Sequence, residues 1–227
     1  MMVLGLDSAA GACSAALWRD GAVVARRLAL MERGHAEALM PMAQAAMAEA
    51  GAGFAALDGI GVTVGPGAFT GLRIGLAAAR GLALAADIPA VGITTFEALA
   101  AAVPEAERAG RTLLAAVDSK RADVYVQLFD ARLAPLTEPA ALPVAEVAAL
   151  LPPGPLLTVG DGVALLAPVL AGRPVAAAGA PPYPDAAWVA VLAARRLAVG
   201  RPAAPPAPLY LRPPDAIRPV HGGRLRP

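Results

Sequence analysis

Two stretches far apart in the chain repeat one pattern of residues. Residues 4–18 read LGLDSAAGACSAALW and residues 115–129 read AAVDSKRADVYVQLF, which places Asp7 and Ser8 on a second Asp-Ser pair that begins at Asp118. Each copy predicts an apolar strand, an Asp-Ser turn and a second strand, followed by another turn and a third strand. Because two unrelated hairpins can also match over so short a stretch, duplication and coincidence both stay open. Duplication predicts two halves of similar architecture.

Helices and strands alternate after the first three strands of each half. The first half predicts a helix over 35–51, a strand over 60–65, a helix over about 69–86, a strand over 89–93 and a helix from about Thr95. The second half predicts strands to about Leu136, a helix near 144–151, a strand over 156–160 and helices near 162–170 and 185–199. This order predicts an α/β fold in which helices cover a mixed sheet in each half. The expected domains are 1–103, 104–200 and a Pro- and Arg-rich tail, 201–227, that wraps the surface or is partly disordered.

Charge and cysteine content limit the possible partners. The formal net charge is +1, which gives no field strong enough to predict a nucleic acid or a membrane as direct partner. Arg212, Arg218, Arg224 and Arg226 make the tail basic, but we expect no sequence-specific RNA binding. Cys13 is the only cysteine, so no internal disulfide can form. Since Asp7 also interrupts the apolar run that an export signal needs, we expect a cytoplasmic protein.

The stretch GPGAFTGLRIG, residues 65–75, has the glycine density of a phosphate-binding loop. A Walker loop needs a Lys and then Ser or Thr after its last glycine, but Leu72 and Arg73 follow Gly71. A dinucleotide-binding loop needs its third glycine where Thr70 stands, so neither motif matches. We expect instead a turn that leads into the next helix, formed by Gly65, Pro66, Gly67, Phe69 and Thr70.

Small residues recur at every fourth position from Gly67 through Gly71, Gly75 and Ala79. On a helix they form one flat ridge, and each helical glycine destabilises the helix by about 1 kcal/mol relative to Ala. Close packing should offset that loss, against either this protein's own sheet or a partner helix. The predicted partner surface consists of His35, Leu39, Met42 and Ala46 on the first helix with Gly71, Arg73, Gly75, Leu76, Ala79 and Arg80 on the second.

Five segments together resemble the TsaB family, the dimerisation subunits of the bacterial machinery that makes N6-threonylcarbamoyladenosine in tRNA. They are GLDSAAGACSAAL, GHAEALMPM, VGPGAFTGLRIGLAAARGLA, VDSKRADVYVQLF and PLYLRPPDA, and they run nearly from end to end. The resemblance implies two ribonuclease-H-like lobes, as in actin, sugar kinases and Hsp70. It also implies a non-catalytic scaffold and activator that binds TsaD, the paralogue that transfers the threonylcarbamoyl group.

Further partners also follow from the resemblance. It implies that the ATPase TsaE docks on the pair with TsaD, that the chain forms a homodimer when alone, and that it has no cofactor of its own. A nucleotide at the interface with TsaD stays open.

The residues themselves allow a test of the non-catalytic role. Where TsaD binds a metal through two His, the resemblance places Thr95 and Leu99, and Leu cannot ligate a metal. In ATPases of this fold, backbone N–H groups of small turns after the first strand of each lobe approach the phosphates. Asp7 and Ser8 keep such a turn, but Asp118 is followed by Lys120 and Arg121 in place of glycine. We expect degenerate phosphate turns and no metal; the alternative is a small kinase of this fold or a glycoprotease-like hydrolase.

Overall fold

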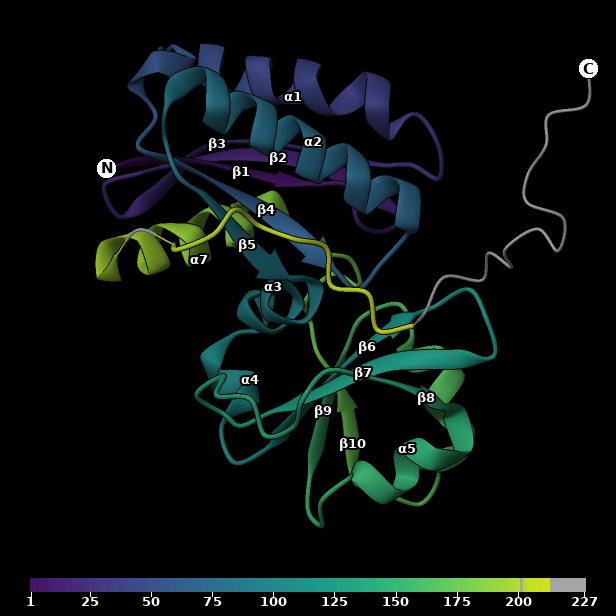
Figure 1. The fold of residues 1–227 in the computed structure, drawn as a ribbon. Coiled ribbons are helices and arrows are strands. Elements are labelled where there is room, and N and C mark those ends of the chain that lie inside the picture. The colour runs from purple at the N-terminus through teal and green to yellow at the C-terminus, as the bar shows by residue number, and fades with distance from the viewer. Residues whose placement is uncertain (201, 213–227) are drawn as a thin grey trace, which may run out of the picture.

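Two five-stranded mixed sheets with equivalent strand order form the centre of the protein (Figure 1). The computed structural model describes residues 1–200 and 202–212. The first sheet has the order β3-β2-β1-β4-β5 and contains β1 (Met2–Asp7), β2 (Ala12–Arg19), β3 (Ala22–Leu30), β4 (Gly59–Gly65) and β5 (Ala90–Thr94). The second has the order β10-β9-β6-β7-β8 and contains β6 (Thr112–Asp118), β7 (Asp123–Phe129), β8 (Ala140–Pro143), β9 (Leu156–Val159) and β10 (Val175–Ala177).

The pairing of strands is the same in the two sheets. β1 pairs antiparallel with β2 and parallel with β4, and β6 pairs antiparallel with β7 and parallel with β9. The third strand of each half joins antiparallel and the fifth joins parallel. The predicted architecture, an α/β fold of two lobes with mixed sheets whose first three strands are antiparallel, is therefore confirmed.

One predicted strand boundary is wrong. Strands were expected to reach about Leu136, but β7 ends at Phe129 and β8 begins only at Ala140, with an isolated bridge from Phe129 to Pro135 between them. The Asp130 carboxylate accepts hydrogen bonds from the backbone N–H groups of Arg132 and Ala134, each at 2.8 Å. This side chain favours a turn over a continuous ladder.

The predicted helices form, but the helix expected near 162–170 is a 3-10 turn followed by a short α-helix, and the elements at 54–56 and 105–108 were not predicted. They are α1 (His35–Glu49), α2 (Phe69–Ala86), α3 (Thr95–Ala102), α4 (Glu105–Arg108), α5 (Val144–Leu150), α6 (Ala167–Leu170) and α7 (Ala186–Val199), with 3-10 turns η1 (Phe54–Ala56) and η2 (Val163–Leu166). α3 begins with a capping box, in which Thr94 and Glu97 each accept a hydrogen bond from the other's backbone N–H. Asp185 caps the N-terminus of α7, because its carboxylate accepts a hydrogen bond from the N–H of Ala187 at 2.9 Å.

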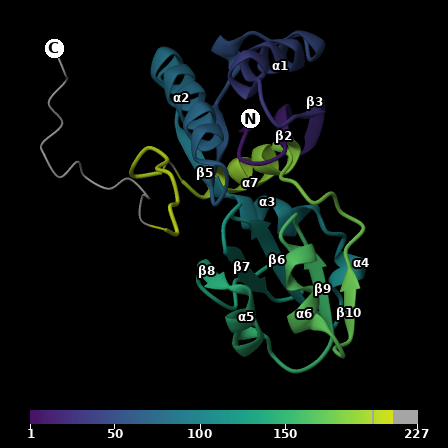
Figure 2. The same ribbon diagram turned by 90° about the vertical axis from the view of Figure 1, so that its right-hand side faces the viewer.

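Each sheet is covered on both faces (Figures 1 and 2). In the first lobe α1 and α2 cover one face, where Leu4 and Leu6 of β1 are buried, and α7 covers the other face, where Val3 is buried. In the second lobe α3 packs on one face through Phe96 and Leu99, and α5 and α6 cover the other. Each central strand thus carries apolar residues on both faces of its sheet, as a strand covered on both faces requires.

The position of α7 differs from the predicted division of the chain. The boundaries 1–103 and 104–200 assign residues 186–199 to the second lobe, but α7 packs on the first sheet. A Cβ atom at Gly5 would lie 2.7 Å from the backbone nitrogen of Ala190, and one at Gly61 would lie 2.9 Å from the carbonyl oxygen of Val189. Glycines of β1 and β4 therefore allow the close approach of a helix from the far end of the sequence.

α2 is long and apolar enough, by length and composition alone, to cross a membrane. A third of its residues are buried in the lobe, and its buried stripe, Gly71, Leu72, Gly75, Leu76 and Ala79, packs toward the first sheet. α2 is accordingly a helix of the lobe, as the sequence predicted.

Candidate functional site

The ends of the two central strands carry matching aspartate turns. β1 ends at Asp7 and β6 ends at Asp118. The Asp7 carboxylate accepts a hydrogen bond from the N–H of Ala9 at 3.2 Å, and the Asp118 carboxylate accepts one from the N–H of Lys120 at 2.7 Å. In each case the acceptor is two residues before the donor, which is the Asx-turn arrangement. The prediction that Asp7 and Asp118 occupy equivalent turns is confirmed.

The first turn buries its carboxyl group completely. Asp7 is fully buried, and burial raises its pKa to about 7, opposed by the nearby Thr63 hydroxyl and by the N–H of Ala9. The charge of Asp185 raises it further. Neither Oδ2 of Asp7 nor Oγ1 of Thr63 has a hydrogen-bond partner among the described residues. The Asp7 carboxyl group is thus enclosed by the lobe.

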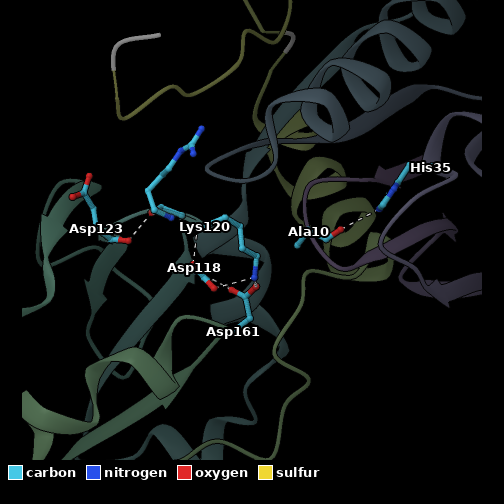
Figure 3. Close-up of polar contacts among 8 residues, drawn as sticks. Ala10, His35, Asp118, Lys120, Asp123 and Asp161 are labelled. Atoms are coloured by element: carbon cyan, nitrogen blue, oxygen red, sulfur yellow. Dashed lines mark hydrogen bonds and ion pairs between the residues drawn. The ribbon is translucent and has the colours of Figure 1, made fainter. Parts of the chain in front are cut away.

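The second turn is closed by a cation of its own. The ammonium group of Lys120 lies 2.9 Å from Oδ2 of Asp118 and 3.8 Å from Oδ2 of Asp161 (Figure 3). Although burial acts to raise it, the hydrogen bonds and charge of Lys120 lower the pKa of Asp118. The hydrogen bond to Asp118 in turn raises the pKa of Lys120, while burial raises the pKa of Asp161. One positive charge therefore stands between two carboxylates.

Backbone donors of the second turn are already used by its own side chains. The N–H of Asp118 donates to Asp161 at 2.9 Å, the N–H of Lys120 donates to Asp118, and the N–H of Arg121 donates to the Ser119 hydroxyl at 3.2 Å. A phosphate-binding turn needs such groups free to approach the ligand. Lys120 also adopts a left-handed conformation with φ of 58°, which non-glycine residues rarely adopt. The sequence predicted crowding by Lys120 and Arg121 but missed Asp161, although the pattern Gly-Asp-Gly directly after β9 could have indicated it.

The turn that leads into α2 forms as predicted. Gly65 has a φ of 115°, and the next residues connect β4 to a helix that begins at Phe69. A Cβ atom on Gly67 would collide with the carbonyl oxygen of Ala9. The N–H of Ala68 donates to that same oxygen at 2.8 Å, while Phe69 and Thr70 are exposed. The glycines of this stretch thus allow the start of α2 to lie directly against the first aspartate turn, and they face atoms of the protein itself.

The small-residue ridge of α2 lies inside the lobe. A Cβ atom on Gly71 would collide with the carbonyl oxygen of Ser8, and one on Gly75 would lie 2.9 Å from the Ser8 hydroxyl and 3.4 Å from Val62. Ala79 is fully buried. The ridge packs against the protein's own turn and sheet, so its placement on the partner surface is wrong and the internal-packing alternative is correct.

Other residues of the predicted partner surface also pack inside the lobe or are half-buried. Leu39, Ala46 and Leu76 belong to the core between the sheet and the two helices, because their stripes face β1 and β4. Met42 and His35 are half-buried, and Nε2 of His35 lies 3.1 Å from the carbonyl oxygen of Ala10 (Figure 3).

Arg73 and Arg80 are exposed but hold the C-terminal segment. Nε of Arg73 donates to the Tyr210 hydroxyl at 3.2 Å, and Arg80 donates to the carbonyl oxygen of Pro206. The predicted surface thus divides into core residues, half-buried residues and two arginines that contact 202–212. Arg218, Arg224 and Arg226 of the predicted tail lie outside the described residues.

A second small-residue stripe faces outward from α2. Ala77, Gly81 and Ala85 also recur at every fourth position and are exposed, and a Cβ atom on Gly81 would meet no atom within 4 Å. Leu84 beside them is 85% exposed. The neighbouring helix α1 exposes Pro41, Gln44 and Ala48. These seven residues are termed the outer helix face. All except Gln44 are apolar, and the small residues among them leave room for close contact with another helix.

No described cluster has the composition of a metal site. Within residues 1–200 and 202–212 no group of three or more His, Cys, Asp and Glu side chains is placed to hold a metal ion. The Thr95 hydroxyl donates to the carbonyl oxygen of Pro66 at 2.6 Å, and Leu99 is buried against the second sheet. The two positions where the resemblance places metal ligands are therefore occupied by a structural hydrogen bond and an apolar contact.

Comparisons with known proteins identify relatives of the chain. The profile of the family described as TsaD, tRNA N6-adenosine threonylcarbamoyltransferase, matches residues 29–170. The tRNA threonylcarbamoyladenosine biosynthesis protein TsaB of Escherichia coli (strain K12) is 38% identical over 125 residues, which is 55% of this chain and 53% of that protein. The chain thus spans about half the length of the curated TsaB proteins that it matches.

Solved structures extend the similarity to the whole fold. YeaZ from Pseudomonas aeruginosa is 30% identical with a TM-score of 0.81, covering 92% of this chain and 99% of that one. An inorganic polyphosphate/ATP-glucomannokinase from Arthrobacter sp. strain KM shares 14% identity with a TM-score of 0.50, covering 86% of this chain and 99% of that one. The kinase shows the fold alone, and together the two structures confirm the predicted class of two ribonuclease-H-like lobes.

Proposed function

Since this chain belongs to the TsaD family and is of the TsaB type within it, we propose that it serves N6-threonylcarbamoyladenosine formation in tRNA as a non-catalytic scaffold and activator. Its partner in this proposal is TsaD, the catalytic subunit. The contact uses the outer helix face of α1 and α2. The observation that carries this proposal is the exposed stripe of Ala77, Gly81 and Ala85, which has no side chain large enough to keep a second helix away.

The closed second turn supports a role without catalysis. Lys120 neutralises Asp118 and Asp161, and side-chain oxygens already accept the N–H groups of Asp118, Lys120 and Arg121. A nucleotide phosphate at this turn would have to displace several hydrogen bonds that the protein makes with itself. The two lobes therefore have a fold that kinases also have, but the backbone donors of the second turn are bonded to the protein's own side chains.

Additional partners extend the same proposal. TsaE would dock on the pair that the chain forms with TsaD, and a second copy of the chain could occupy the outer helix face when TsaD is absent. Such a homodimer would be isologous, because the same surface would be used by both copies. A nucleotide at the joint interface with TsaD is compatible with this arrangement.

Co-purification with the host's TsaD tests the proposal. Gly81→Leu and Ala77→Leu should reduce TsaD binding at least tenfold, because each adds a large side chain where helix backbones would approach closely. The matched control is Ala148→Leu, which makes the same change at an exposed position of α5 in the second lobe. None of the three variants should lose thermal stability. Normal TsaD binding by Gly81→Leu and Ala77→Leu would place the interface elsewhere.

A further inference from the structure

Residues 202–212, termed the strap, are fastened to the first lobe by backbone and side-chain contacts. The Arg80 guanidinium donates two hydrogen bonds to the carbonyl oxygen of Pro206, from Nε at 3.1 Å and from Nη2 at 2.6 Å. The N–H of Leu209 donates to the carbonyl oxygen of Val64 at 2.7 Å, and the Leu209 side chain packs against the first-lobe core. The strap is therefore held at the carboxyl end of β4.

An aromatic contact adds to this attachment. The rings of Phe69 and Tyr210 lie 5.5 Å apart between centroids, and the Arg73 guanidinium lies 3.7 Å from the centre of the Phe69 ring. Arg73 also donates to the Tyr210 hydroxyl. Stacked aromatic and guanidinium groups attract each other even at partly exposed sites. The first turns of α2 and the strap thus form one packed unit.

Two residues farther along, the strap contacts the other lobe. Leu211 packs against the second-lobe core that contains Phe129 and Val117, and Nε of Arg212 lies 3.3 Å from Oδ2 of Asp123 at the start of β7. Figure 1 shows the strap running from α7 across β5 and under α2 to the end of the β6–β7 hairpin. Leu209 and Leu211 are consequently anchored in different lobes.

The lobes also meet through α3, which packs on the second sheet and contacts β4 and α7. Lobes that are joined through a packed helix and connecting segments can still rotate about them, as in hinge motions. A second attachment through the strap, with Leu209 at the carboxyl end of β4 and Arg212 at Asp123, opposes that rotation. The carboxyl end of β4 and the start of β7 are then fixed relative to each other.

We propose that the strap locks the two lobes in one orientation, so that the protein is a single rigid body and not a hinged one. The lock has two ends: Arg80, Val64 and the Phe69 ring hold it to the first lobe, and the apolar core beside Leu211 and the Asp123 carboxylate hold it to the second. This inference concerns the isolated chain and does not depend on the identity of its partner.

Distance measurements between the lobes test the lock. Labels attached to Ala55→Cys in the first lobe and Ala148→Cys in the second, both at exposed positions, report the lobe orientation. Cys13 is buried and stays unlabelled. The double variant Leu211→Asn/Arg212→Gln releases the second-lobe end, and Arg80→Gln weakens the first-lobe end while it retains an uncharged polar side chain. We expect the distance distribution to widen roughly twofold in the double variant and less in Arg80→Gln.

Hydrogen exchange gives a second readout on the same proteins. The Leu209 amide is protected by its bond to Val64, so its exchange should become about tenfold faster in both variants. Leu165→Asn/Arg132→Gln, a pair of exposed side chains of the second lobe, is the matched control and should change neither measurement.

Three outcomes would overturn the proposal. Unchanged distances together with unchanged exchange would show that the strap contacts contribute nothing measurable. Faster Leu209 exchange with unchanged distances would show that the strap detaches while the lobes stay in place. Widening of equal size in the control pair would show that the lobes move without involvement of the strap. Circular dichroism would verify that each variant is folded. If the double variant does not fold, the distances and the exchange rate measured in Arg80→Gln still test the proposal.

Discussion

The Ser8 hydroxyl donates a hydrogen bond to the carbonyl oxygen of Gly71 at 2.8 Å. This contact joins the aspartate turn at the end of β1 to the small-residue ridge of α2, and both groups are buried. The glycines of the ridge therefore allow a helix to pack directly on a turn of its own lobe.

Enlarging the buried ridge should destabilise the fold. In Gly75→Leu the new side chain meets the Ser8 hydroxyl and Val62, and overpacking of this kind lowers the free energy of unfolding by about 1 to 3 kcal/mol. Urea unfolding would measure the loss. Gly81→Leu, on the outer helix face of the same helix, is the matched control and should lose no stability, since glycine is a weaker helix former than leucine. Equal stability of the two variants would contradict the assignment of the buried face.

Neutralising Asp7 should change how stability depends on pH. The pKa of Asp7 is about 7 in the folded protein against 3.8 for an ordinary aspartate, so its contribution to stability is complete below about pH 4 and is lost as pH rises toward about 7. That difference corresponds to a loss of up to about 4 kcal/mol. Asp7→Asn should therefore be more stable than the wild type at about pH 8, with little difference near pH 4.

Urea unfolding at several pH values would measure this effect. The exposed carboxylate Asp87, changed to Asn, serves as the control and should leave the pH profile of the wild type in place. A wild-type profile that is flat between about pH 4 and 8 would show that the Asp7 carboxylate is stabilised by a group not identified above.

Removing the cation of the second turn should shift two titrations. In Lys120→Met the Asp118 and Asp161 carboxylates lose the ammonium group that lies between them, so the pKa of Asp118 should rise and that of Asp161 should rise further. Carboxyl carbon chemical shifts measured against pH would follow both groups. Arg132→Met removes an exposed cation elsewhere in the second lobe and should move neither titration.

The isolated protein should show no ATP hydrolysis, peptidase activity or stoichiometric zinc or iron. The reason is that the N–H groups of the second turn are occupied, and Thr95 and Leu99 make internal contacts where the TsaB-family resemblance places metal ligands. Phosphate release assays and elemental analysis of purified protein would test this. Rapid ATP turnover that is lost in Asp7→Ala would overturn the prediction, and so would one metal ion per chain.

Local patterns in the sequence determined the elements and their repetition. The alternation of apolar residues around Asp7 and Asp118 predicted equivalent strands and turns, and the periodicity of 35–51 and 69–86 predicted α1 and α2. These features depend on residues close together in the chain, because strand and helix periods are set by backbone geometry. The turn at Gly65 was predictable for the same reason.

Tertiary structure alone decided which neighbour each surface meets. Gly75 and Gly81 lie on two stripes of the same helix, each built from small residues four apart, and the spacing does not reveal which stripe faces the sheet. Asp161 approaches Asp118 only because β9 lies beside β6. α7 packs on the first lobe, Leu209 packs on the first lobe and Leu211 on the second, all through contacts with residues far away in the sequence. Such contacts depend on the packing of whole elements, which the local pattern of residues does not contain.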